Sequence, residues 1–293
     1  MFLVPFTHHR PASLDEVFET LAKHGDDAAV YAGGTELLLA LKARVLRYEH
    51  LIDLKRVKEL SGIRIEDEEL VIGALATHHQ IANNDLVQAH IPAYAALSEE
   101  IANIRVRAAG TLAGNLAFAE PHSDPPSLLS AMDATLILVS SGGKRGVPMR
   151  EFILSEFTTA REENELIAEI RIPVTAAGEG FAYRKFGHLE RPAVGASAGC
   201  VMRGGKPSYR LWFGAIGDRP LHAKEIEDAI AGVPAASLPE ALPKAVRDFA
   251  SGISTASDLH GSADYKQHLA SVLIQRALAA ACEAAQSRGA ANA

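Results

Sequence analysis

The chain has 293 residues and carries 29 Lys and Arg against 36 Asp and Glu, which gives a formal net charge of −7 at pH 7. Hydrophobic residues make up 48% and charged residues 22%, a balance typical of a globular protein of about two domains. The acidic charge disfavours a nucleic-acid binder or a polybasic membrane-surface protein. Two cysteines, Cys200 and Cys282, cannot build a disulfide framework or hold an iron–sulfur cluster by themselves.

The N-terminal residues 1–13 show no cationic segment followed by an apolar run, so no secretory signal is expected. The longest apolar stretches, such as 135–139, are far too short to span a bilayer. We therefore expect a cytoplasmic protein with both thiols free, which is compatible with peripheral association with membrane acceptors.

The first predicted element is a helix that a capping box, Ser13 to Glu16, opens and Gly25 ends. A short apolar strand is predicted over 28–32. The turn Gly33-Gly34-Thr35 follows, and a helix is predicted over 36–43. The order is strand, glycine turn, helix.

The middle of the chain alternates short apolar runs with turn residues, and a second capping box runs from Thr77 to Gln80. A helix is predicted over 93–104, and Gly142-Gly143 turns the chain after the strand 135–140. The remaining strands are predicted at 51–54, 63–65, 70–72 and 166–172. Residues 175–180 are small and flexible, which is typical of a linker.

After this linker the pattern changes from strands to helices, which favours an α+β C-terminal domain. The strands are predicted at 181–186, 194–202 and 209–216, with a turn at Gly204-Gly205. The helices are predicted at 223–231, 239–249 and 264–285, with Ser262 as the N-cap of the last. Residues 287–293 are expected to fray.

Two glycine turns carry the strongest chemical signal. They are Gly33-Gly34-Thr35 and the segment Gly110 to Asn115. Glycines allow a ligand to approach backbone N–H groups, and successive N–H groups bind anions. Two such turns with flanking hydroxyl groups fit the pyrophosphate of a dinucleotide without Lys or Arg. The alternative is that both are only tight turns.

Other catalytic and phosphate-binding motifs are absent or weak. No GxGxxG or P-loop pattern occurs, which disfavours a nicotinamide-binding Rossmann domain and an NTPase. Gly195 to Gly199 matches GxSxG, but no helix is predicted after it, so we interpret it as a closely packed strand. The 12 histidines include the pairs His8-His9 and His78-His79, without a metal-binding spacing, and they predict no metal site. His122-Ser123-Asp124 is too contiguous for a catalytic triad.

Asp124 lies between Pro121 and Pro125, and these prolines stiffen its loop. A fixed carboxylate can accept a hydrogen bond from a ribose hydroxyl, as in other dinucleotide sites. Alternatively, Asp124 is an N-terminal acid of a helix over 127–131.

Together these motifs resemble the FAD-binding medium subunit of the molybdenum hydroxylases, in particular the carbon monoxide dehydrogenase medium-subunit group. The resemblance covers nearly the whole chain. It rests on Pro11, Ala32 to Glu36, Leu51 to Leu54, Val71 to Ala74, the block GTLAGNLAFAEPHSD that ends at Asp124, Lys185, and Ser262 to Tyr265. Ala113 stands where the family has a glycine, so we expect an ordinary backbone conformation there or a slightly shifted loop. Glu190-Arg191-Pro192 replaces an acidic and an aromatic residue of relatives, which leaves the cover of the flavin ring open.

The resemblance implies an α+β fold with a two-lobed FAD-binding region of the vanillyl-alcohol-oxidase type over 1–176. The lobes would be about 1–56 and 57–176. A C-terminal domain with a three-stranded antiparallel sheet and helices would follow over 177–293. The implied FAD-binding residues are Ala32, Gly33, Gly34, Thr35, Glu36, Ile101, Arg107, Thr111, Leu112, Ala113, Gly114, Asn115, Asp124, Ile167 and Lys185. Within this set Asp124 would bind the adenosine ribose and Lys185 would approach the flavin. No catalytic acid or base is implied.

The implied function is that of an FAD-carrying, electron-transfer oxidoreductase subunit of a heterotrimer. A small subunit would hold two [2Fe–2S] clusters and a large one the molybdopterin cofactor, in a dimer of heterotrimers. Substrate (carbon monoxide, an aldehyde or an N-heterocycle) would be oxidised on the large subunit, and electrons would leave FAD for an external acceptor. The alternatives are a self-contained FAD-dependent reductase with its own substrate pocket, and a scaffold that keeps the fold without FAD.

Overall fold

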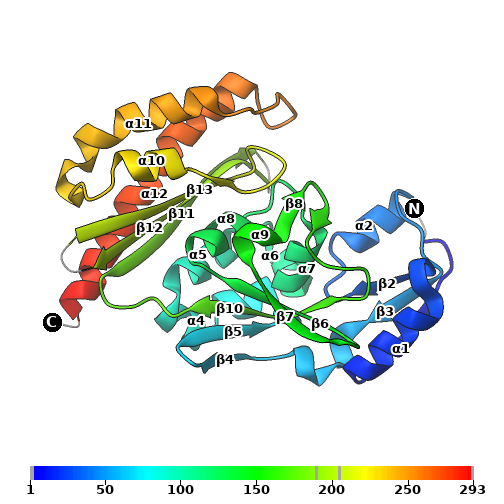
Figure 1. Cartoon of the computed structure of the whole chain (residues 1–293). Coiled ribbons are helices and arrows are strands. Elements are labelled where there is room, and N and C mark those ends of the chain that lie inside the picture. The colour runs from blue at the N-terminus through cyan, green and yellow to red at the C-terminus, as the bar shows by residue number, and fades with distance from the viewer. Residues whose placement is uncertain (1–2, 189–190, 204–205, 292–293) are drawn as a thin grey trace.

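The computed structural model describes residues 3–188, 191–203 and 206–291. Its N-terminal lobe is a small parallel sheet in the order β1-β3-β2, flanked by two helices (Figure 1). The strands are β1 (Thr7–His9), β2 (Ala28–Tyr31) and β3 (His50–Asp53), and the helices are α1 (Leu14–His24) and α2 (Leu37–Lys42). The strands β2 and β3 and both helices agree with the predictions for this region, whereas no strand was predicted at β1.

The capping residue predicted for α1 is confirmed. The Ser13 hydroxyl accepts a hydrogen bond from the Glu16 backbone N–H at 3.3 Å. The Glu16 carboxylate accepts from the Ala12 N–H at 2.6 Å, one residue before the expected partner. Gly25 follows with φ +51°, a conformation that favours glycine and ends the helix.

A larger, antiparallel sheet forms the middle of the molecule, in the order β4-β5-β10-β6-β7. Its strands are β4 (Ile63–Glu66), β5 (Glu69–Gly73), β6 (Thr135–Ser140), β7 (Gly143–Pro148) and β10 (Leu166–Pro173). A separate pair comprises β8 (Ile153–Ser155) and β9 (Thr158–Thr159). The helices are α3 (His78–Ala82), α4 (Asp85–His90), α5 (Pro92–Glu100), α6 (Ile104–Ala109), α7 (Leu112–Phe118), α8 (Pro125–Ala131) and α9 (Met149–Phe152). The capping box at Thr77 is confirmed at the start of α3.

The continuous helix predicted over 93–104 is wrong. The chain leaves α5 after Glu100, and Ala102 adopts φ +42°, which a regular helix does not contain. Asn103 then caps the separate helix α6 by accepting from the Arg105 N–H at 3.0 Å. A helix also forms at α7, where the sequence suggested only a glycine turn.

The C-terminal domain is a second antiparallel sheet with helices on one face, in the order β11-β12-β13-β14 (Figure 1). The strands are β11 (Glu179–His188), β12 (Arg191–Arg203), β13 (Lys206–Gly214) and the two-residue β14 (Leu221–His222). The helices are α10 (Lys224–Ala229), α11 (Leu238–Gly252) and α12 (Ala263–Ala291). This arrangement confirms the α+β fold class, with the short β14 added to the three expected strands. The division into 1–176 and 177–293 remains a prediction.

Helix α12 packs closely on β11 and β12, because small residues line the contact. A Cβ on Gly180 would collide with the backbone of Ala281 and Ala285. The helix continues to Ala291, so the expectation that the tail frays from residue 287 is wrong for residues 287–291. Near its end, the Arg288 guanidinium donates to the backbone oxygens of Thr175 and Ala89, both at 3.1 Å.

Part of the predicted pattern lies outside the described residues, namely the turn Gly204-Gly205 and residues 292–293. In the part of the chain that the structure describes, no helix has the length and hydropathy needed to cross a membrane.

Candidate functional site

The two glycine segments predicted from the sequence lie against each other. A Cβ on Gly33 would collide with the carbonyl oxygen of Ala109 and come within 2.9 Å of the Gly110 Cα. A Cβ on Gly110 would lie 3.3 Å from the Thr35 hydroxyl oxygen. Glycine is therefore required at Gly33 for the close approach of the two backbones. The fold brings together two segments that are remote in the sequence.

The first segment connects β2 to α2. Gly34 has φ +71°, which glycine adopts without strain. The Ala32 carbonyl accepts a long hydrogen bond from the Lys55 ammonium group at 3.4 Å. Glu36 is the last residue before α2, and its carboxylate lies 3.4 Å from the Arg191 guanidinium.

The second segment leads into α7 rather than forming an open loop. The Thr111 hydroxyl caps the helix by accepting from the Gly114 N–H at 3.1 Å. Leu112 and Ala113 are buried in its first turn. Ala113 has no positive φ, which confirms the ordinary backbone expected there. The Asn115 side-chain oxygen accepts from the Ser123 hydroxyl at 2.6 Å, which links α7 to the loop before α8.

His78 lies directly beside the second segment. Its backbone N–H donates to the Gly110 carbonyl at 3.0 Å, and its side chain is 2% exposed. Its Nδ1 atom has no hydrogen-bond partner among the described residues. Burial, with a smaller effect of Arg107, lowers the pKa of His78 to about 4, so this imidazole is neutral at pH 7. The sequence suggested only a capping or solvated histidine here, and the neighbouring capping box gave no signal of its burial.

Asp124 is one of the most deeply buried carboxylates of the site, at 5% exposed. It is at the N-terminus of α8, but its side chain makes no capping hydrogen bond to that helix. It accepts instead from the Tyr183 hydroxyl at 2.7 Å and from the Lys185 ammonium at 3.0 Å. Burial raises the pKa of Asp124, and both β11 partners oppose this rise.

Lys185 has a second partner in the first domain, the carbonyl oxygen of Glu100, at 2.8 Å. Tyr183 and Lys185 are two residues apart in β11, so their side chains share one face of the strand. Strand β11 thereby binds both α5 and the start of α8. The sequence analysis identified Lys185 but missed Tyr183. Tyr183 lies two positions before Lys185 in a predicted strand, and this spacing indicates that both side chains share one face.

The remaining predicted residues, Arg107, Ile101 and Ile167, lie in the first domain and stabilise its backbone and core. The Arg107 guanidinium donates to the carbonyls of Ile101 and Ala102, each at 2.9 Å, and so holds the break between α5 and α6. Ile101 and Ile167 are buried in the core of the first domain.

Arg191 connects the C-terminal domain to the first glycine segment. Its guanidinium lies 2.8 Å from the Glu120 carboxylate as well as 3.4 Å from Glu36. His122 lies close by, with Nδ1 3.2 Å from Glu120 and Nε2 3.5 Å from Asp258. These contacts close one side of the site. Of the tripeptide that departs from relatives, Glu190 lies outside the described residues.

Two other patterns have no catalytic arrangement. Ser197 of the GxSxG match lies in the middle of β12, is fully buried and donates to the Ser127 hydroxyl at 2.9 Å, which confirms the closely packed strand. Ser123 and His122 bond to different partners, as the sequence analysis expected for residues too contiguous to form a triad.

The site combines several features that suit a dinucleotide. The two glycine segments present backbone without side chains at Gly33 and Gly110, and they already lie in contact, because an added Cβ at Gly33 would collide with the Ala109 carbonyl. An unpartnered buried imidazole lies beside one segment, and a buried carboxylate with an adjacent ammonium group lies at the domain contact. These groups suit a pyrophosphate and the polar ends of a ligand that spans both domains.

Comparison with known families agrees with this site. Residues 4–175 match the family described as FAD binding domain in molybdopterin dehydrogenase. Residues 191–281 match the family described as CO dehydrogenase flavoprotein C-terminal domain. The chain belongs to the family of FAD-binding proteins of molybdopterin dehydrogenases. It is an oxidoreductase component of the molybdenum hydroxylase class, and its cofactor is FAD.

Individual relatives extend over nearly the full length. The carbon monoxide dehydrogenase medium chain of Hydrogenophaga pseudoflava is 37% identical over 281 residues, 94% of this chain and 96% of the relative. The glyceraldehyde dehydrogenase medium chain of Sulfolobus acidocaldarius is 32% identical, over 94% of this chain and 98% of the relative. Among solved structures, carbon monoxide dehydrogenase from Hydrogenophaga pseudoflava superposes with a TM-score of 0.91 at 35% identity, covering 98% of this chain and 99% of that chain.

Proposed function

We propose that the chain is the FAD-carrying, electron-transfer subunit of a heterotrimeric molybdenum hydroxylase. The observation that carries the proposal is the contact of the two glycine segments at Gly33 and Ala109, beside a domain contact formed by Asp124 and Lys185. Bound FAD supplies the redox chemistry, because it exchanges electrons in one- or two-electron steps that amino-acid side chains do not provide. The protein binds, orients and shields the cofactor.

In this proposal each predicted residue has a structural task. Ala32 to Glu36 and Thr111 to Asn115 hold the pyrophosphate, through those backbone N–H groups that have no partner within the protein. The N–H groups of Leu112, Gly114 and Asn115 already donate internally and are not among them. Asp124 accepts from the adenosine ribose. Lys185 was expected to approach the flavin, but its ammonium group lies 3.0 Å from the Asp124 carboxylate, so in this proposal both residues serve the same part of the cofactor. Arg107, Ile101 and Ile167 shape the surface under the cofactor.

The partners follow from what this chain lacks. Its two cysteines, Cys200 and Cys282, are buried in the C-terminal domain and cannot ligate two [2Fe–2S] clusters. We therefore assign the clusters to a small subunit and the molybdenum cofactor to a large one, in a dimer of heterotrimers in the cytoplasm. Electrons would enter FAD from the small subunit and leave to an external acceptor. Relatives named as medium chains or lettered subunits support this assignment.

Affinity purification from the native source, with measurement of flavin, iron and molybdenum, tests the proposal. We expect two co-purifying chains, one of them cysteine-rich, and a flavin spectrum that follows this chain when the subunits are separated. A flavin-containing monomer that turns over NAD(P)H and a substrate without partners would instead establish a self-contained reductase. A complex that assembles and works without flavin would establish a scaffold.

A further inference from the structure

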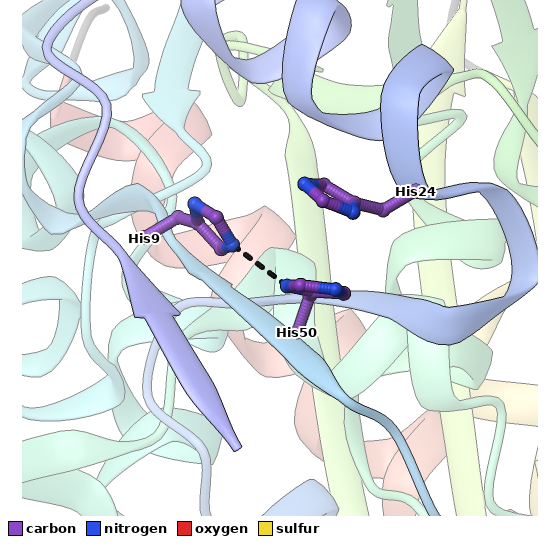
Figure 2. Close-up of side chains that lie close together, drawn as sticks. All are labelled: His9, His24 and His50. Atoms are coloured by element: carbon purple, nitrogen blue, oxygen red, sulfur yellow. Dashed lines mark hydrogen bonds between the residues drawn. The ribbon is translucent and has the colours of Figure 1, made fainter.

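A cluster of three histidines lies in the N-terminal lobe, and the FAD site does not use it. His9 is the last residue of β1, His50 the first of β3, and His24 the last of α1 (Figure 2). Each is half-buried, and each offers a ring nitrogen within 4.8 Å of the others. The sequence predicted no metal site, because the three residues are remote from one another in the chain.

The fold explains why the three rings meet. Strands β1 and β3 are parallel, with Thr7 opposite His50 and His9 opposite Ile52, so His9 and His50 lie on the same face of the sheet. His8 points to the other face, where its Nε2 is 3.1 Å from the Tyr31 hydroxyl. Helix α1 ends over the first face and delivers His24.

The geometry is close to that of a three-imidazole metal site. His9 Nε2 lies 3.0 Å from His50 Nδ1, and the nitrogens of a tetrahedral zinc site, with Zn–N bonds of ~2.0–2.1 Å, are about 3.3 Å apart. The His24 ring stacks on His50 at a centroid distance of 3.6 Å and must turn to present a nitrogen. His24 is the last residue of its helix and half-exposed (Figure 2), and one of its ring nitrogens lies within 4.8 Å of those of His9 and His50.

The ligand types of the cluster also suit a transition metal. No carboxylate or thiol belongs to the group. Imidazole ligands select zinc, copper and nickel over magnesium and calcium.

We propose that His9, His24 and His50 form a binding site for one divalent transition-metal ion, represented by Zn²⁺, with a water molecule as the fourth ligand. The ion ties β1, β3 and the end of α1 together. It thereby fixes the sheet whose strand β2 leads into the first glycine segment.

The test uses the FAD-loaded protein, freed of any affinity tag and stripped with a chelator. Competition with a chromogenic chelator measures Zn²⁺ binding, and Co²⁺ provides a visible spectrum that reports four-coordinate geometry. We expect one Zn²⁺ per chain in the wild type. In His24→Gln the Zn²⁺ affinity should be at least about tenfold lower, because loss of even a hydrogen-bond partner of a ligand lowers metal affinity that much. His90→Gln is the matched control, since His90 is also half-buried and also the last residue of a helix, α4.

A second set of readouts separates metal binding from misfolding. His50→Asn tests the ligand within the sheet, and thermal melting without metal shows that each variant is folded. Added Zn²⁺ should raise the melting temperature of the wild type and of His90→Gln but not of His24→Gln or His50→Asn. The proposal is overturned if the wild type binds Zn²⁺ no more tightly than folded His24→Gln, or if His90→Gln loses binding equally.

Discussion

Lys185 of the C-terminal domain lies 3.0 Å from Asp124 of the FAD-binding region, and both side chains are largely buried. Such a pair is not a source of net stability in itself, because desolvation of two charges offsets their attraction. Loss of one partner is different, since the other charge then stays buried without compensation. The pair therefore specifies how the two domains meet beside the glycine segments.

Lys185→Met should lower the free energy of unfolding by about 3 kcal/mol, because it leaves Asp124 buried with only the Tyr183 hydroxyl as a partner. Urea unfolding of the purified protein measures this change. Lys224→Met is the matched control, since the Lys224–Asp228 pair on α10 is exposed and should contribute less than about 1 kcal/mol. Equal effects of the two substitutions would show that the buried pair has no special role. The double variant Asp124→Asn, Lys185→Met should recover part of the loss.

Gly33→Ala should weaken flavin binding while leaving the C-terminal domain folded. The added Cβ collides with the Ala109 carbonyl and forces the two glycine segments apart. We expect flavin affinity to fall by at least about tenfold, equivalent to about 1.4 kcal/mol, measured by fluorescence titration of the apoprotein. Gly217→Ala is the control, because a Cβ there would have no neighbour within 4 Å. Full flavin occupancy in Gly33→Ala would contradict the assignment of this segment.

His78 should make the protein acid-sensitive over a defined range. Its pKa is about 4 in the folded state against 6.5 for the unperturbed group, so the unfolded state binds the proton first as pH falls. The stabilisation from the neutral imidazole is present above pH 6.5 and is lost as pH falls towards 4, by up to about 3 kcal/mol. Urea midpoints at a series of pH values measure this loss. His78→Gln should flatten the profile, whereas a change at the exposed His79 should leave it as in the wild type.

The two cysteines should be unreactive in the native protein. Cys200 of β12 and Cys282 of α12 are both buried. Their mutual hydrogen bond and burial raise the pKa of Cys282, whereas the same hydrogen bond lowers the pKa of Cys200, so the low reactivity expected of Cys200 rests on burial alone. A chromogenic disulfide reagent should label neither thiol rapidly under native conditions and both in denaturant. Rapid native labelling of either residue would show that α12 separates from the sheet.

Much of the fold could be predicted locally. Ser13 and Thr77 predict the starts of α1 and α3, because an N-cap depends only on residues that are close in the sequence. The break after Glu100 was missed because it depends on Arg107, which holds the carbonyls of Ile101 and Ala102. Helix α7 was missed because its small residues read as a turn, whereas burial of Leu112 stabilises a helix there.

The site was also predictable only in part, because local sequence patterns do not show which distant segments come into contact. The glycine segments carry their own signal, but their contact depends on the fold of two lobes. The spacing of two from Lys185 was the only sequence signal for Tyr183. The partners of Tyr183 and Arg191 and the burial of His78 depend on how the C-terminal domain and α3 pack, which no local pattern encodes. The three histidines of the N-terminal lobe belong to the same class, since parallel pairing of β1 and β3 brings them together.

The hydrogen bonds of Arg288 can form only late in the synthesis of the chain. This residue, near the end of α12, donates to the carbonyls of Thr175, at the start of the linker, and Ala89 in α4. A chain emerging from the ribosome can fold its first domain early, because domains fold as units during synthesis. These two bonds from Arg288 form only after residue 288 has been translated, whereas the bond from the Thr175 N–H to the His90 carbonyl can form within the first domain. A chain truncated before residue 288 therefore lacks two of the hydrogen bonds that join α12 to the linker and to α4.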